Sequence, residues 1–70
     1  MISAQELKVY ALGGRRVVYV RAGRGEKLRD HLGSRGFPAG LAQAAGLDRL
    51  ELERHADVGE AQAALDDWPR

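Results

Sequence analysis

Few residues of this chain could act as nucleophiles, metal ligands or proton-transfer groups. Cysteine is absent, serine occurs at Ser3 and Ser34, and histidine at His31 and His55. Nucleophilic catalysis needs a base beside the nucleophile, and a metal needs several ligands at close spacing. Neither pattern surrounds these residues. His55 and Asp57 could form a dyad, but they are more simply a strand end and a helix cap. We therefore expect no enzymatic activity, no cofactor and no metal.

The segment Gly23-Arg24-Gly25, with Lys27 close behind, has the composition of an anion-binding turn. Backbone N–H groups at the start of a helix can hold a phosphate. The segment lacks the spacing of a P-loop or a dinucleotide fingerprint, however. Glu26 also brings negative charge to the place where an anion would lie. A plain connecting loop is therefore the simpler interpretation.

The formal charge changes sign along the chain. Residues 1–36 contain eight basic and three acidic side chains, whereas residues 37–70 contain three basic and seven acidic ones. The halves either neutralise each other, on folding or in a homodimer, or leave a basic surface for an anionic partner. Asp66 and Asp67 fall where a final helix would end, so we expect that turn to fray or to face a basic partner.

Length and composition indicate one small domain over residues 1–70. Without cysteine, no disulfide or cysteine-ligated metal can add stability. The longest aliphatic stretch, residues 17–20, is far shorter than a membrane span, and residues 1–8 contain no apolar run of signal-peptide length. We predict a soluble, cytoplasmic protein without a membrane partner.

The clearest structural signal is a β-hairpin. Residues 7–12 and 15–22 are strand-like, and Gly13-Gly14 between them accepts the positive φ angles of a two-residue turn. In the resulting register, Leu12 pairs with Arg15 and Val9 with Val18. The face expected in the core carries Leu7, Val9, Ala11, Val18 and Val20. The face expected to be wetter carries Lys8, Tyr10, Val17, Tyr19 and a Glu6–Arg21 pair.

Helical spacing follows the hairpin. Residues 26–35 place Leu28 and Leu32 on one face, and Gly36 suits a C-terminal stop. Residues 37–43 have two interpretations. Pro38 could open a short helix, whereas the alternation of apolar positions favours an edge strand, the interpretation that we prefer. The alternating positions are Phe37, Ala39, Leu41 and Gln43.

The last third of the chain predicts a strand and a helix. Over residues 47–55, Leu50 and Leu52 alternate with charged residues, as in a strand with one buried face. Asp57 can then cap a helix, with Glu60 completing a capping box. Pro69 ends that helix, and Trp68 should make its largest core contribution. The expected buried stripe is Val58, Ala61, Leu65 and Trp68.

The element order is therefore ββαββα, and the predicted fold class is α+β. Two helices would cover one face of a four-stranded antiparallel sheet, giving a two-layer sandwich that is a circular permutation of the ferredoxin-like fold. The residues that carry a family resemblance are Leu32, Gly36-Phe37, Ala39, Gly46, Leu50, Leu52, Asp57, Ala61 and Leu65.

In these positions the chain resembles small prokaryotic ferredoxin-like domains described as signal-transducing proteins of unknown function. The resemblance covers about residues 26–68, and its motifs are ones that any small sandwich could share. This chain departs from that family because it begins with a hairpin instead of a single strand. The resemblance implies a ligand- or partner-binding role and no catalytic residues.

The uncovered sheet face is the expected binding surface. Tyrosine is enriched at protein interfaces, so the first hypothesis is a protein-interaction or regulatory module that binds a protein or a second copy of itself. The alternative is an RNA- or phosphate-binding module, in which tyrosines stack on bases and cations hold phosphates. Glu51 and Glu53 oppose that alternative, because they repel phosphates and could pair with arginines of the hairpin. The expected site residues are Lys8, Tyr10, Arg15, Val17, Tyr19 and Arg21.

Overall fold

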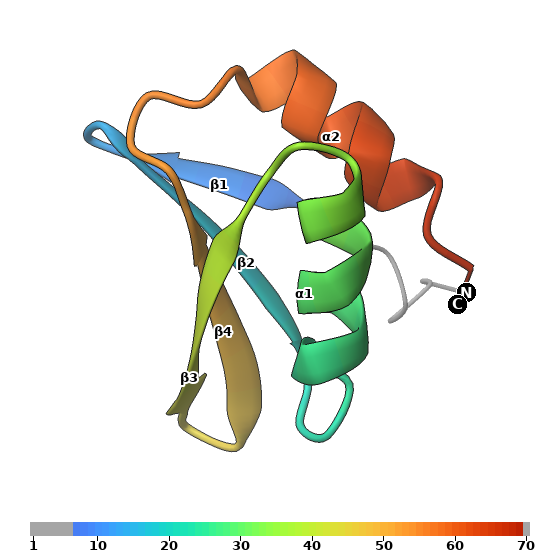
Figure 1. The fold of residues 1–70 in the computed structure, drawn as a ribbon. Coiled ribbons are helices and arrows are strands. Elements are labelled where there is room, and N and C mark those ends of the chain that lie inside the picture. Colours follow the sequence, from blue (N-terminus) through green and yellow to red (C-terminus); the bar gives the residue numbers. More distant parts are fainter. Residues whose placement is uncertain (1–6, 70) are drawn as a thin grey trace, which may run out of the picture.

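The structure is a computed structural model that describes residues 7–69 of the chain. Its elements follow the predicted order: β1 (Val9–Leu12), β2 (Arg15–Arg21), α1 (Gly25–Ser34), β3 (Ala39–Ala44), β4 (Leu47–Leu52) and α2 (Val58–Asp66). The strands form one antiparallel sheet in the order β1-β2-β4-β3 (Figure 1). The predicted α+β class, with four antiparallel strands and two helices, is confirmed.

The hairpin forms in the predicted register. Val9 is paired with Val18 and Leu12 with Arg15, and Gly13 takes the positive φ of +61° that the turn requires. The strands are shorter than predicted at their outer ends, since β1 begins at Val9 and β2 ends at Arg21. Glu6, the expected partner of Arg21, lies outside the described residues.

The segment after the hairpin resolves the ambiguity of residues 37–43 in favour of a strand. Helix α1 ends at Ser34, and Gly36 follows it at φ +89°, as expected of a C-terminal stop. Strand β3 then pairs along its whole length with β4, from Ala39 opposite Leu52 to Ala44 opposite Leu47. Because β4 lies between β2 and β3, β3 is an outer strand of the sheet.

The predicted cap of α2 is present. The Asp57 carboxylate accepts a hydrogen bond from the backbone N–H of Glu60 at 2.9 Å. Strand β4 ends at Leu52, three residues before the predicted His55. Helix α2 ends at Asp66, so Trp68 lies just beyond it and is still buried. The backbone N–H of Trp68 donates to the Leu65 carbonyl at 3.1 Å.

One buried cluster joins both helices to one face of the sheet. Leu28 and Leu32 of α1 and Leu65 of α2 are fully buried in it. Figure 1 shows α1 beside β3 and β4, and α2 alongside β1, in agreement with the contacts between these elements. Ala11 was expected in the core and is exposed, because it lies near the hairpin tip. The cluster consists of Val9, Val18, Val20, Leu28, Leu32, Leu50, Leu52, Ala61, Ala64, Leu65 and Trp68.

Candidate functional site

The opposite face of the sheet carries no helix within the described part of the chain. Side chains alternate between the faces of a strand, and the pairing registers show which residues share this surface. We call it the open face. Its members are Tyr10 and Leu12 of β1, Arg15, Val17, Tyr19 and Arg21 of β2, Gly40, Ala42 and Ala44 of β3, and Leu47, Arg49 and Glu51 of β4.

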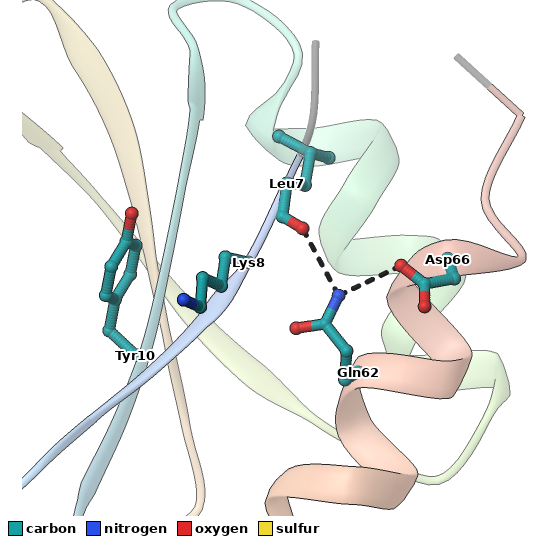
Figure 2. A pocket seen from close by; sticks show the side chains of 5 residues that line it. All are labelled: Leu7, Lys8, Tyr10, Gln62 and Asp66. Atoms are coloured by element: carbon teal, nitrogen blue, oxygen red, sulfur yellow. Dashed lines mark hydrogen bonds between the residues drawn. The ribbon is translucent and has the colours of Figure 1, made fainter. Parts of the chain in front are cut away.

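Two tyrosines meet on the open face. The ring centroids of Tyr10 and Tyr19 are 6.1 Å apart, and the ring planes are inclined at 61°, an edge-to-face contact between neighbouring strands. Tyr10 is exposed and Tyr19 is half-buried. Lys8, which precedes β1, is also exposed and lies close to Tyr10 (Figure 2). The structure therefore brings Lys8, Tyr10 and Tyr19 close together, and the other three expected site residues, Arg15, Val17 and Arg21, lie on the same face of β2 as Tyr19.

Val17 differs from the expectation. It was assigned to the wetter face as a partner-binding residue, but its exposed fraction is 1%. The register places Tyr10 opposite it on β1 and Glu51 opposite it on β4. A small side chain on a central strand is covered by larger neighbours on both sides. Val17 is therefore covered by the side chains around it, and a partner would not contact it without displacing them.

Arg15 and Glu51 form a two-pronged ion pair on the open face. Arg15 Nε donates to one carboxylate oxygen at 2.8 Å, and Nη2 donates to the other at 2.9 Å. These hydrogen bonds hold the pKa of Glu51 below its ordinary value, with nearby arginine charges adding to the effect, and they raise the pKa of Arg15. The expected pairing of a hairpin arginine with a β4 glutamate is therefore present.

The sequence reasoning missed several residues of this face. Leu12 and Leu47 are exposed at 51% and 41%, and Tyr10 at 45%. These three are the exposed large hydrophobic residues of the described chain. Arg49 lies opposite Tyr19, and its Nε is buried without a hydrogen-bond partner. The alternation of side chains along a strand would have placed them on this face, because Leu12 is two residues from Tyr10 and Arg49 is two residues from Glu51.

A shallow pocket of about 500 Å³ adjoins the face at the outer side of β1. Figure 2 shows Lys8 and Tyr10 on the strand and Gln62 and Asp66 on α2. The Gln62 side chain bonds the Leu7 carbonyl at 3.2 Å and one Asp66 oxygen at 2.9 Å. One cation and one anion thus line this pocket together with two uncharged polar groups.

The glycine-rich turn is already occupied by a side chain of the protein. One oxygen of Asp48, Oδ2, accepts hydrogen bonds from the N–H groups of Gly23 and Gly25, both at 2.9 Å. Asp48 is 5% exposed and lies on β4. A carboxylate at the start of α1 takes the two N–H groups that a phosphate would use. The structure therefore favours the connecting-loop interpretation of this segment.

The other residues considered for chemistry have structural roles. His31 Nε2 lies 2.8 Å from the Ala64 carbonyl and links the two helices. His55 takes a φ of +62° in the turn after β4, where its backbone N–H donates to the Gly14 carbonyl. Asp67 forms an ion pair with Arg35, so the acidic end of α2 faces a basic group of the same chain.

No group of three or more His, Asp or Glu side chains in residues 7–69 is arranged to hold a metal ion. No helix in that range has the length and apolar character needed to cross a membrane. Comparisons with protein-family models, curated proteins and solved structures find no match for this chain. The residues of the open face are therefore the basis for assigning a function to this chain.

Proposed function

We propose that this protein is a small non-enzymatic interaction or regulatory module that binds a protein partner through its open face. The observation that carries the proposal is the position of Tyr10, Leu12 and Leu47, the exposed large hydrophobic residues of the described chain, which all belong to that face. Exposed apolar groups distributed over one face, among polar ones, suit a partner surface that spans that face.

The charges of the open face favour an acidic partner. Arg15, Arg21 and Arg49 contribute three positive charges against the single negative charge of Glu51. Glu51 is occupied by Arg15, whereas Arg49 has no ion pair among the described residues and a buried Nε that lacks an acceptor. A carboxylate of the partner would pair with the exposed part of the half-buried Arg49 side chain, and charge-assisted bonds of this kind are stronger than neutral ones.

RNA or phosphate binding is the second candidate, favoured by the Tyr10–Tyr19 pair beside Lys8 and Arg21. Base stacking needs an accessible ring face, and phosphate binding needs cations that are not already paired. Tyr19 is half-buried, and Arg15 is already paired with Glu51. These two features make a protein the better-supported partner.

The wider assignment belongs to the same proposal. The strand order β1-β2-β4-β3, with ββαββα connectivity, is the order expected of a circularly permuted ferredoxin-like sandwich, and it supports that fold for the chain. We also place the protein in the cytoplasm, since it contains no cysteine that would benefit from an oxidising compartment.

Amide chemical shifts can test the binding proposal with two probes. The first is a short peptide of alternating glutamate and leucine, and the second is a mixed-sequence RNA oligonucleotide. We expect the peptide to shift amides around Leu12, Tyr19 and Arg49. Arg49→Ala should weaken peptide binding by about tenfold, because it removes a charge-assisted contact. Arg29→Ala, on α1, is the matched control and should bind as the wild type does.

The RNA arm separates the two candidates. Binding of RNA that weakens steeply between low and moderate salt, with shifts in residues 8–24, would replace the protein partner by nucleic acid. A response to neither probe, or peptide shifts confined to the helices, would contradict a role for the open face.

A further inference from the structure

The two edges of the sheet differ in how their free backbone groups are satisfied. At the β1 edge, Gln62 of α2 accepts a hydrogen bond from the Val9 N–H at 2.9 Å and donates to the Leu7 carbonyl at 3.2 Å. Figure 2 shows this side chain beside the strand. Its amide takes the place that a peptide group of another strand would occupy. Helix α2 therefore closes this part of the β1 edge.

The β3 edge has no such protection within the described chain. Apart from the pairing with β4, no hydrogen bond within residues 7–69 reaches Ala39–Ala44. Proteins usually guard an edge strand with a charge, a proline or a β-bulge. The six residues of β3 are Ala, Gly, Leu, Ala, Gln and Ala, and their register with β4 has no interruption. Nothing in β3 therefore opposes the addition of another strand.

The direction of the free groups on β3 follows from the register. Backbone groups of successive residues in an antiparallel strand point alternately to its two neighbours. The Val9 N–H points out of the sheet toward Gln62, so the groups of its partner Val18 point toward β4. The same alternation continues through the pair Val18–Leu50 and the pair Leu50–Leu41. Ala39, Leu41 and Gln43 therefore direct their N–H and C=O groups away from β4.

We propose that β3 pairs in antiparallel orientation with β3 of a second copy of this chain, across a two-fold axis perpendicular to the sheet. Such an axis joins the two sheets into one of eight strands and keeps all helices on one side. The open faces of the two copies then form one continuous surface. This inference is independent of what the open face binds.

A second copy fits this edge because the approach brings no like charges together. Every side chain of β3 is uncharged. The open-face cation nearest to this edge is Arg49, which lies on β4 opposite Ala42. Across the axis, two such arginines would be separated by three strand spacings, about 14 Å. That distance exceeds the Debye length of about 8 Å at physiological ionic strength. Their mutual repulsion is therefore largely screened.

The composition of β3 limits the strength of this pairing. Alanine and glycine have low strand propensity and offer little side-chain contact across a strand pair, so the association rests mainly on backbone hydrogen bonds. The pairing of two short edges buries less than the roughly 1,000 Å² typical of stable interfaces, so we expect a weak dimer. Its dissociation constant should lie in the micromolar range or above.

The test compares Gln43→Lys with Ala63→Lys over a range of protein concentrations. Gln43 is exposed and lies on the helix side of β3, away from the open face, whereas Ala63 is exposed on α2. Both variants gain one charge. For the wild type we expect concentration-dependent sedimentation and rising exchange protection of the amides of residues 39, 41 and 43. Gln43→Lys should weaken association by about tenfold, because it brings a charge into the strand pair, and Ala63→Lys should not.

Three outcomes would overturn the proposal. A chain that stays monomeric at millimolar concentration has no such dimer. Equal association of Gln43→Lys and the wild type would place the contact elsewhere. Concentration-dependent shifts at Tyr10, Tyr19 and Leu12 instead of β3 would locate self-association on the open face. The peptide-binding experiment uses Arg49→Ala, so failure of one proposal leaves the other to be judged separately.

Discussion

Asp48 is a buried charged residue whose role is set by two hydrogen bonds. Its Oδ2 atom accepts from Gly23 and Gly25 at the start of α1, so one side chain of β4 fixes the turn between β2 and the helix. The partial positive charge of a helix N-terminus favours a carboxylate in this place. The glycine-rich turn that has the composition of an anion site therefore binds the carboxylate of the protein's own Asp48.

The contribution of Glu51 to the stability of the fold depends on pH. Hydrogen bonds from Arg15 lower its pKa in the folded protein, so the pair's contribution to stability is present above the unfolded-state pKa. That contribution is lost as the pH falls through the folded-state value. Arg15→Gln should therefore raise the pKa of Glu51 toward that of an ordinary glutamate. Carboxyl carbon shifts followed over an acid titration would measure it.

A matched arginine variant controls this titration. Arg29 lies on α1 and is paired with Asp30, not with Glu51. Arg29→Gln should leave the Glu51 titration curve unchanged. If Arg15→Gln also left it unchanged, the two hydrogen bonds would not be the cause of the lowered pKa.

Helix α1 contains a pair of glycines that test how closely this element packs. A Cβ atom added at Gly25 would lie 2.6 Å from Leu41 Cδ1 and 2.7 Å from Asp48 Oδ2, whereas one added at Gly33 would meet nothing within 4 Å. The start of the helix is therefore pressed against the sheet, while Gly33 faces open space. Only the first glycine is required by packing.

Alanine at these two positions should change stability in opposite directions. Gly25→Ala should destabilise the protein by about 1–3 kcal/mol through overpacking. Gly33→Ala should stabilise it by about 0.5–1 kcal/mol, because alanine restricts the unfolded chain and favours the helix. Urea unfolding followed by circular dichroism would give both free energies. A neutral or stabilising Gly25→Ala would show that the turn can move away from β4.

At the scale of the whole molecule, the charge asymmetry of the chain is used on folding. Arg15 pairs with Glu51, and Arg35 pairs with Asp67, so these two ion pairs join the basic half of the sequence to the acidic half. Part of the basic character is thereby neutralised inside one molecule. If the open face binds as proposed, we expect its unpaired cations, rather than the total count, to determine which partner it attracts.

Trp68 is a large part of a small core, and its removal should be felt by the whole fold. It is buried in the cluster that joins both helices to the sheet, and the Arg24 guanidinium lies 4.8 Å from its ring centroid. A chain of this length has a stability of about 4–10 kcal/mol. Truncation of a buried tryptophan to alanine costs about 3–5 kcal/mol. Trp68→Ala should therefore unfold at far lower urea concentrations and lose much of its amide dispersion.

Trp68→Phe is the informative companion to that variant. It retains an aromatic ring in the buried cluster and should lose less than half as much stability as Trp68→Ala. Similar unfolding midpoints for the alanine variant and the wild type would mean that the C-terminal segment does not contribute to the core.

Features that depend on near neighbours along the chain were predictable from the residues alone. The Gly13-Gly14 turn set the hairpin register, alternation identified Leu50 and Leu52 as buried, and Asp57 marked the start of α2. In each case the signal and the structure that it predicts lie within a few residues of one another. The order of elements followed from these local signals.

Contacts between distant parts of the chain became apparent only in the folded arrangement. The antiparallel pairing of β2 with β4 brought Glu51 to Arg15, covered Val17 and carried Asp48 to the glycine turn. The packing of α2 placed Gln62 on the β1 edge, whereas the β3 edge of the sheet has no such cover within the described residues. Such contacts join residues far apart in the sequence, so no local pattern specifies them, and they exist only once the sheet and the helices have assembled.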